Sequence, residues 1–198
     1  MSKSKAKVKM LKISIIGDSK TGKTSIINCF SGHEFNINML TSIGIDKQEV
    51  WMKMKDGNEI KLIIWDTAGQ KRYYSISTGT IKNSHGIIVC YALNDKKSFA
   101  NVVTWLEDER EISINIPIVL FGNKCDLTNE RKVTYEEAEK FANNNKMVYF
   151  ETSAKDNINI KEGFEKIAED AYEKDISNRT EKIEISKQNN KKKKKKFC

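Results

Sequence analysis

The sequence predicts an α/β domain in which a six-stranded, mostly parallel sheet carries helices on both faces, with one antiparallel pair at its edge. Three observations support this fold class. Six short runs rich in Ile, Val and Leu alternate with segments of helical periodicity, which is the pattern of strands joined by crossover helices. A glycine-rich turn joins the first apolar run to the first helical segment, and a hairpin turn separates the second run from the third.

The strands and helices can be assigned in chain order. Apolar runs predict strands at 11–16, 45–54, 60–65, 86–91, 117–121 and 147–150. Helical periodicity occurs at 23–31, 95–111, 134–145 and 159–174. Residues 55–58 read Lys-Asp-Gly-Asn, which predicts a hairpin between the second and third strands. We expect Asn94 or Asp95 to cap the second helix, and Pro117 to open the fifth strand, where its missing N–H costs least.

Residues 17–24 read GDSKTGKT and match the phosphate-binding pattern G-x-x-x-x-G-K-[ST]. The match lies between the first predicted strand and the first predicted helix, where this pattern has a mechanism. Gly17 and Gly22 let backbone N–H groups approach an anion without an intervening Cβ, and the positive end of the helix dipole adds to the field. All four constrained positions match, so a phosphate site is favoured over a glycine-rich turn that binds nothing.

Polar groups in two motifs are placed to act on a nucleotide triphosphate. We expect Lys23 to bridge the terminal phosphates and the Thr24 hydroxyl to face Mg²⁺. Asp66 follows the third strand in Asp-Thr-Ala-Gly-Gln and can hold the Mg²⁺ shell through water. Gly69 lets a backbone N–H approach the γ-phosphate, and the Gln70 amide can orient an attacking water, so both join Lys23 as expected catalytic residues. The expected contacts of the phosphate loop are Asp18, Ser19, Lys20, Thr21, Gly22, Lys23, Thr24 and Ser25.

Two further motifs select the base. Residues 123–126 read Asn-Lys-Cys-Asp and follow the fifth strand. The Asp126 carboxylate offers two acceptors to adjacent N–H donors on the edge of guanine, and adenine has no such pair, so discrimination should be strong. Residues 152–155 read Thr-Ser-Ala-Lys and can aim the Ala154 N–H at a guanine carbonyl. The expected base contacts are Asn123, Lys124, Asp126, Ser153, Ala154 and Lys155.

In this order and at these spacings, the four motifs resemble those of Ras-superfamily small GTPases from about Met10 to Tyr172. Within that superfamily, the chain most resembles the Rab family. That match rests on GDS at 17–19, IGID at 43–46, WDTAGQ at 65–70, HGIIV at 85–89 and ETSAK at 151–155. No extra helix is needed between Asp126 and Glu151, which argues against the Rho family. The resemblance implies a P-loop NTPase G domain over residues 10–175, between a flexible basic segment 1–9 and a disordered tail 176–198.

The resemblance to Rab proteins implies a GTP-driven switch with slow, Mg²⁺-dependent hydrolysis, acting in vesicle trafficking. It makes Ser42, 19 residues after Lys23, the ligand of Mg²⁺ in the first mobile loop, with Thr41 as the fallback and Phe35 as a nucleotide contact. The implied metal ligands are Thr24, Ser42 and Asp66. The implied partners of a monomeric chain are an exchange factor, a GTPase-activating protein, an escort or GDI-type carrier, and effectors.

Among the residues that depart from the Rab pattern, four bear on the switch or its partners. Ser42 replaces a threonine but keeps the hydroxyl, and Lys47 replaces a phenylalanine of the effector surface, so general Rab effectors should bind poorly. Lys71 replaces an acidic residue, which puts nucleotide exchange in doubt. Lys20 replaces a common glycine, and a lysine is tolerated there if its φ is negative. We interpret the chain as a divergent Rab-like protein.

Two other function classes compete with the switch. The altered mobile loops leave open a scaffold that holds GTP or GDP and does not switch, although the intact Thr24, Asp66 and Gln70 argue against it. A kinase that transfers phosphate to a small acceptor is a third class. It would not need the base motifs at 123–126 and 153–155.

Charge and composition bound the remaining possibilities. The formal net charge is +8, but twelve lysines at the two ends are unaccompanied by acids, so the body is mildly acidic and a nucleic-acid-binding face is not supported. There is no 18-residue apolar run. We expect reduced packing cysteines at Cys29, Cys90 and Cys125, structural roles for His33 and His85, and packing roles for Trp51 and Trp105.

The tail reads as a linker that ends in a membrane address. It closes on Lys191–Lys196, Phe197 and Cys198 without a C-a-a-X box. Rab-type proteins are prenylated at cysteines at or near their end, so the resemblance implies geranylgeranylation of Cys198. One lipid anchors only marginally, but the six lysines can supply a second signal at an anionic surface. We therefore expect the chain in the cytosol and at the cytoplasmic face of an endomembrane or the plasma membrane; an unmodified tail, a nuclear-import signal or a truncated end is the alternative.

Overall fold

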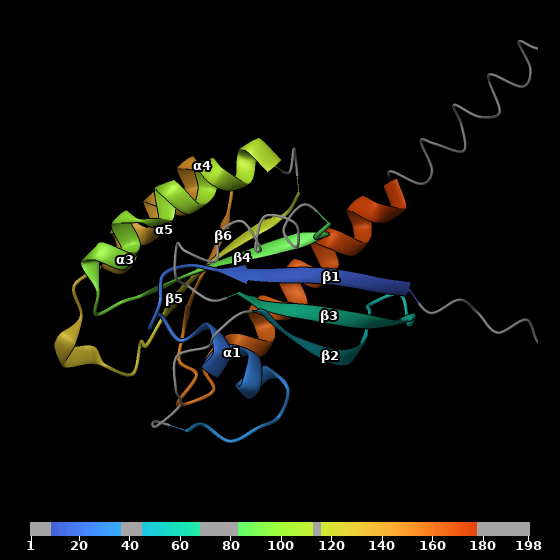
Figure 1. Ribbon diagram of the computed structural model, residues 1–198, viewed down its shortest axis with the longest axis horizontal. Helices are drawn as coiled ribbons and strands as arrows, with labels where there is room; N and C mark the ends of the chain where they lie inside the picture. The colour runs from blue at the N-terminus through green and yellow to red at the C-terminus, as the bar shows by residue number, and fades with distance from the viewer. Residues whose placement is uncertain (1–8, 37–44, 68–82, 113–115, 178–198) are drawn as a thin grey trace, which may run out of the picture.

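The computed structural model describes residues 9–36, 45–67, 83–112 and 116–177, which form a six-stranded sheet with helices on both sides (Figure 1). The strand order is β2-β3-β1-β4-β5-β6. The strands are β1 Lys9–Ile16, β2 Ile45–Lys53, β3 Glu59–Thr67, β4 Gly86–Ala92, β5 Ile118–Asn123 and β6 Val148–Thr152. Among these strands, β2 and β3 pair antiparallel and the other neighbours pair parallel. The predicted fold class is confirmed.

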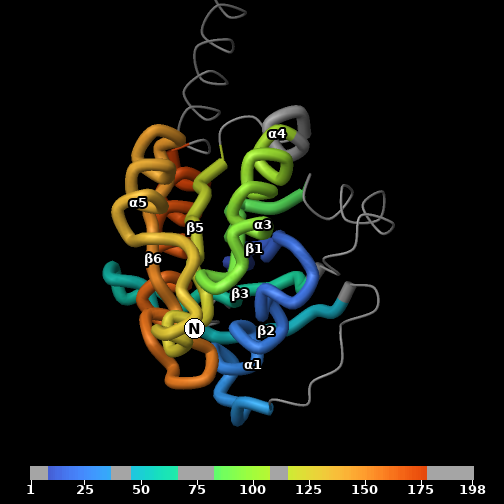
Figure 2. Tube along the Cα trace, turned by 90° about the vertical axis from the view of Figure 1, so that its left-hand side faces the viewer, coloured from blue at the N-terminus to red at the C-terminus, as the bar shows by residue number. Residues whose placement is uncertain are grey.

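Helices cover both faces of the sheet. They are α1 Lys23–Phe30, α3 Lys96–Ala100, α4 Val102–Ile112, α5 Tyr135–Asn144, the 3₁₀ helix η2 Thr128–Glu130 and a helix over residues 160–177. The helix over 160–177 and α1 lie on one face, and α3, α4 and α5 lie on the other (Figures 1 and 2). Because β1, β3, β5 and β6 run parallel, the loops that leave their carboxyl ends meet at one end of the sheet. Ligands bind at this end in open α/β sheets.

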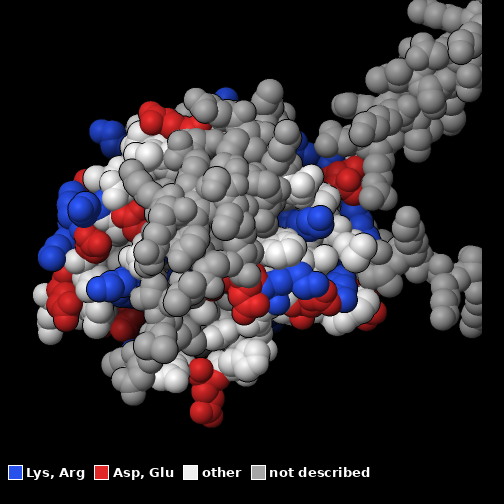
Figure 3. Space-filling model, viewed as in Figure 1, with Lys and Arg blue, Asp and Glu red and all other residues white. Residues whose placement is uncertain are grey.

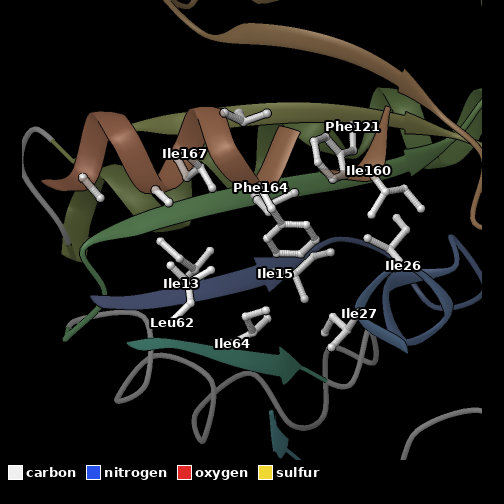
Figure 4. Close-up of a cluster of buried hydrophobic side chains, with 14 of the residues drawn as sticks. Ile13, Ile15, Ile26, Ile27, Leu62, Ile64, Phe121, Ile160, Phe164 and Ile167 are labelled. Carbon is white, nitrogen blue, oxygen red and sulfur yellow. The ribbon is translucent and has the colours of Figure 1, made fainter. Parts of the chain in front are cut away.

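A buried apolar cluster lies between the sheet and the two helices on its first face, α1 and the helix over 160–177 (Figure 4). Alternate residues of β1, namely Leu11, Ile13 and Ile15, are fully buried in it. From the helix over 160–177, Phe164 stacks on Phe30 with ring centroids 4.0 Å apart. Each such buried side chain contributes about 1.5–3 kcal/mol. The cluster thus fixes the strand and helix between which the glycine-rich turn runs.

The predicted helix over 95–111 is in fact two helices, α3 and α4, which flank Asn101. Asp95 is the cap of α3, because its Oδ1 accepts a hydrogen bond at 3.0 Å from the backbone N–H two residues on. The other candidate, Asn94, instead donates to Glu130 at 3.2 Å. Asparagine is a weak helix former whose side chain competes for other partners. The apolar spacing continues across it, so periodicity alone does not reveal the break.

The hairpin and the proline are found where they are predicted. Between β2 and β3, the N–H of Met54 donates to the carbonyl of Asn58 at 2.8 Å. Gly57 adopts a φ of 84°, which the turn requires and which glycine accepts without strain. Pro117 directly precedes β5, and its carbonyl accepts a hydrogen bond from the N–H of Ile87 at 3.0 Å. Both predictions are confirmed.

The packing prediction is confirmed for Trp105 and wrong for Trp51. Trp105 is 6% exposed, whereas Trp51 is 59% exposed. On β2 the neighbours Val50 and Met52 pack against the core cluster. Because successive side chains of a strand point to opposite faces, Trp51 must point away from that cluster.

His85 and the cysteines have the structural roles that we expected. The backbone N–H of His85 donates to the carbonyl of Lys12 at 2.7 Å, and its Nδ1 accepts from the N–H of Lys12 at 3.1 Å. Cys29, Cys90 and Cys125 are free thiols. Within the described ranges, no helix is both long enough and apolar enough to cross a membrane.

Charged side chains of both signs are interspersed on the face shown in Figure 3. Several of the described ones are paired, such as Lys55 with Glu169 at 2.7 Å and Lys9 with Asp175 at 2.9 Å. Pairs at the surface contribute only about 0–1 kcal/mol each to stability. Most of the unaccompanied lysines belong to residues 1–8 and 178–198, outside the described part of the chain.

Candidate functional site

The turn between β1 and α1 has the backbone conformation of an anion-binding loop. Gly17 and Gly22 adopt φ angles of 137° and 95°, which L side chains rarely reach. A Cβ on Gly17 would lie 2.0 Å from the carbonyl oxygen of Cys90, and one on Gly22 would lie 2.3 Å from Nδ2 of Asn123. The loop is therefore packed against β4 and against the end of β5, with no space for side chains at its glycines.

Lys23, the first residue of α1, lies inside this loop. It is 6% exposed, and its Nζ donates to the carbonyl oxygens of Gly17 and Asp18, each at 2.9 Å. Burial lowers the pKa of Lys23. A cation that donates to backbone carbonyls at a helix N-terminus can exchange those partners for phosphate oxygens.

A hydroxyl and a carboxylate meet beside the phosphate loop. The parallel register pairs Ile15 of β1 with Asp66 of β3, which brings the 2%-exposed Asp66 to the loop. Thr24, the second residue of α1, donates from Oγ1 to Oδ2 of Asp66 at 2.5 Å. Magnesium prefers oxygen ligands of this kind, one or two carboxylates completed by water and phosphate. These side chains therefore fit the cation that the phosphate motif implies.

The two base motifs meet at the ends of β5 and β6. The Ser153 hydroxyl donates to Oδ1 of Asp126 at 2.7 Å, and the N–H of Asp156 donates to the same hydroxyl at 3.0 Å. The N–H of Cys125 donates to the carbonyl of Thr152 at 3.0 Å. One oxygen of the Asp126 carboxylate is thus held in place by the neighbouring motif, which orients the whole group.

Asn123 joins the base motif to the phosphate loop. Its side chain is 2% exposed, and Nδ2 donates to the carbonyl of Thr21 at 2.8 Å. Its Oδ1 accepts a hydrogen bond from the Thr152 hydroxyl at 3.3 Å. A single buried amide therefore links three segments that are far apart in the sequence. An asparagine suits this position because its amide can donate and accept a hydrogen bond at the same time.

Proteins of similar sequence identify the family of this chain. Residues 12–173 match the family model of the Ras family. The chain belongs to the Ras family. Ras-related protein Rab-13 of Rattus norvegicus is 40% identical over 162 residues, which cover 81% of this chain and 79% of that protein. GTP-binding protein ypt2 of Schizosaccharomyces pombe is 39% identical over 168 residues (84% of each chain), and Ras-related protein Rab-10 of Diplobatis ommata is 39% identical over 166 (83% and 82%).

These relatives confirm the resemblance to Rab proteins, so the chain is a Rab-like small GTPase of the Ras superfamily. Ras and Rab proteins bind guanine nucleotide and Mg²⁺ in general, and Rab proteins act as GTP-regulated switches in trafficking. Rab proteins also work with exchange factors, activating proteins, carriers and effectors.

In this Rab-like chain, the predicted residues of the phosphate loop and of the two base motifs lie with Asp66 at the carboxyl ends of β1, β3, β5 and β6. Phe35 is also described and is 41% exposed. The other predicted residues lie outside the described part of the chain; these are Thr41, Ser42, Gly69, Gln70 and Cys198, together with the divergent Lys71.

Lys47 brings charge to the place where Rab proteins commonly have a phenylalanine. It lies on β2 opposite Trp65 of β3, and its Nζ donates to Glu49 at 2.8 Å. The other carboxylate oxygen of Glu49 pairs with Lys61. Hydrogen bonds from Lys47 and Lys61 lower the pKa of Glu49 to about 2. The apolar anchor is thus replaced by a lysine that shares one acid with Lys61.

Two residues that touch the phosphate loop were not predicted as site residues. Asn101 and Trp105 both donate side-chain hydrogen bonds to the carboxylate of Asp18. The sequence predicts a packing role for Trp105 and no role for Asn101. No local pattern reveals these contacts, because they join positions 83 and 87 residues apart.

Lys20 does not have the negative φ under which a lysine is readily tolerated there. Its φ is 67°, in the left-handed region, and its side chain is exposed. Lys20 thus shares its positive φ with Gly17 and Gly22 of the same loop although it is not a glycine. A non-glycine residue in this region is strained by about 1–2 kcal/mol.

Replacing Lys20 with glycine is therefore expected to raise the free energy of unfolding by about 0.5–1 kcal/mol, because relief of strain outweighs the greater freedom of glycine in the unfolded chain. Denaturant unfolding of the nucleotide-free protein measures this difference. Lys20→Ala is the matched control, since it removes the charge but keeps the Cβ. An equal gain in Lys20→Ala would show that charge, and not backbone strain, is responsible.

Proposed function

We propose that this chain is a GTP-regulated trafficking switch that binds GTP and GDP with Mg²⁺ and hydrolyses GTP slowly. The observation that carries the proposal is the hydrogen bond from Asn123 to the carbonyl of Thr21 at 2.8 Å. It ties a motif suited to guanine to a loop suited to phosphate, so one ligand that has both parts can span them. ATP has the phosphates but lacks the guanine edge that Asp126 would recognise.

Each end of the nucleotide has its own set of residues. The phosphates are bound by backbone N–H groups of the loop and by Lys23, and the guanine edge is bound by Asp126 and the Ala154 N–H. Bound Mg²⁺ would neutralise charge on the phosphate oxygens. Thr24, Ser42 and, through water, Asp66 would hold it. The remaining nucleotide contacts are Asp18, Ser19, Lys20, Thr21, Gly22, Ser25, Phe35, Thr41, Gly69, Asn123, Lys124, Ser153 and Lys155.

Hydrolysis depends on the placement of one water. The Gln70 amide accepts from and donates to this water and so orients it toward the γ-phosphate, while the Gly69 N–H and Lys23 stabilise charge on the phosphate oxygens. No arginine is expected to reach the γ-phosphate from within the chain, so intrinsic turnover belongs to the slow class, on the order of 10⁻⁴ s⁻¹. A partner that supplies an arginine would accelerate it.

The tail supplies the link to a membrane. A prenyl group on Cys198 gives one weak anchor, and the Lys191–Lys196 run adds about 1 kcal/mol per lysine near an anionic surface. The prenyl group and the lysines together suit reversible attachment of the chain to the cytoplasmic face of a membrane, with a carrier that delivers and removes it. Mass spectrometry of the chain isolated from cells tests this, because an unmodified Cys198 would leave the lysines as the only attachment.

Amide hydrogen exchange with GDP and with a non-hydrolysable GTP analogue tests whether the chain switches. We expect stronger protection with the analogue in the peptides that contain Ser42 and Gly69, because the γ-phosphate and Mg²⁺ hold these segments. Ser42→Ala should remove the gain in its own peptide, whereas the neighbouring Thr41→Ala should retain it. Equal protection with both nucleotides would instead indicate a GTP-binding scaffold that does not switch.

A further inference from the structure

Asp18 is held from two directions. Its backbone carbonyl accepts hydrogen bonds from the Thr21 hydroxyl and from Lys23 Nζ, both at 2.9 Å. Its carboxylate accepts one bond on each oxygen, from Nε1 of Trp105 at 2.9 Å and from Nδ2 of Asn101 at 2.6 Å. The same residue therefore contacts the phosphate-binding lysine through its backbone and the α3–α4 segment through its side chain.

The two donors are themselves fixed in place. Asn101 is the junction residue between α3 and α4, and Trp105 lies one turn into α4. Trp105 is 6% exposed and belongs to the buried cluster on that side of the sheet, with Leu106 and Ile16. Both views of the chain place α3 beside the loop between β1 and α1 (Figures 1 and 2). The break in the helix thus coincides with the point at which it contacts the phosphate loop.

A carboxylate within a phosphate-binding loop is a liability. It repels phosphate, and if it turned inward it would compete for the same backbone N–H groups. The hydrogen bonds from Asn101 and Trp105 satisfy both of its oxygens on the side of α3 and α4. They also fix the carbonyl of Asp18, which holds Lys23.

We propose that Asn101 and Trp105 are positioning residues for the nucleotide site, which act through Asp18 and slow the release of bound nucleotide. The inference rests on the proposed function, because it concerns the same site. Neither residue is expected to touch the nucleotide. Their effect is to keep the Asp18 carboxylate turned away from the phosphates and Lys23 turned toward them.

A reciprocal exchange of side chains tests the proposal in the full-length protein. Asn101→Asp places two carboxylates in contact, and we expect release of a fluorescent GDP in Mg²⁺ buffer to become about tenfold faster or more, since hydrogen bonds to charged groups are strong. Combining it with Asp18→Asn restores a donor opposite an acceptor and leaves an oxygen for Trp105. The double variant should return to within about threefold of the parental rate.

Two further variants separate positioning from stability. Val103→Asp adds the same charge two residues further on, in α4, at a side chain that is 45% exposed, and it should leave the release rate unchanged. Trp105→Phe keeps the ring in the core but removes the N–H, and it should speed release while the melting temperature of the nucleotide-free protein changes little. The indole N–H resonance of Trp105 should shift in Asn101→Asp and recover in the double variant.

The outcomes are distinct. If the parental protein retains GDP but Asn101→Asp releases it at the parental rate, or the double variant releases it as fast as Asn101→Asp, the positioning role is wrong and the proposed function stands. If the parental protein retains no guanine nucleotide, the proposed function fails, and the inference fails with it.

Discussion

Replacing Asp126 with asparagine is expected to shift the nucleotide preference from GTP toward xanthosine triphosphate by about four orders of magnitude. The two carboxylate oxygens are suited to the two adjacent N–H donors of guanine. An asparagine offers one donor and one acceptor, which clashes with guanine but matches xanthine, whose edge carries a carbonyl in place of the amino group. Because Ser153 donates to Oδ1 at 2.7 Å, it should hold the amide oxygen and leave the NH₂ group to face the base.

Displacement of a fluorescent GDP by GTP, ATP and xanthosine triphosphate measures this preference. Asp156→Asn is the matched control, since it makes the same change at an exposed residue of the neighbouring loop, which follows β6, and it should leave the preference for GTP intact. Full GTP affinity in Asp126→Asn would show that this carboxylate does not read the base.

Replacing Gly17 with alanine is expected to lower the free energy of unfolding by more than about 3 kcal/mol, and so to remove most of the stability of a typical domain. The new Cβ would lie 2.0 Å from the backbone oxygen of Cys90, and the φ of 137° is itself unfavourable for alanine. A backbone atom in the centre of the sheet cannot move aside as a flexible side chain would.

Gly32→Ala separates the clash from the backbone strain. Gly32 also has a positive φ, 83°, but a Cβ there would meet nothing within 4 Å. We expect it to lower the free energy of unfolding by about 1 kcal/mol. Denaturant unfolding of both variants gives the comparison, and similar losses would mean that the contact with Cys90 is not the reason for glycine at position 17.

Most of the fold could be predicted from the sequence because the signals are local. The buried strand β4 is a continuous apolar run, β1 is rich in Ile and Leu, and the hairpin is set by Gly57 and its neighbours. The sequence does not predict the exposure of Trp51, because Val50, Trp51 and Met52 are three consecutive apolar residues of an edge strand and composition cannot decide which of them turn inward.

Some residues of the candidate site could be predicted from local patterns, and others could not. The motif residues of the phosphate loop and base loops carry short-range patterns, and the structure brings them together. The left-handed φ of Lys20 could not be foreseen from a lysine. The contacts of Asp18 with Asn101 and Trp105 depend on long-range packing of α3 and α4 against the loop, for which the sequence contains no periodic signal.

Single-turnover hydrolysis of Mg²⁺-GTP by the purified protein, beside Gln70→Leu, tests the central claim most directly. We expect cleavage on the order of 10⁻⁴ s⁻¹ in the parental protein and its abolition in Gln70→Leu, with GTP binding retained in both. Tight binding of GTP with no cleavage in either protein would contradict it, and would make the chain a guanine-nucleotide-binding scaffold whose divergent Lys20, Ser42 and Lys71 are the next residues to revert.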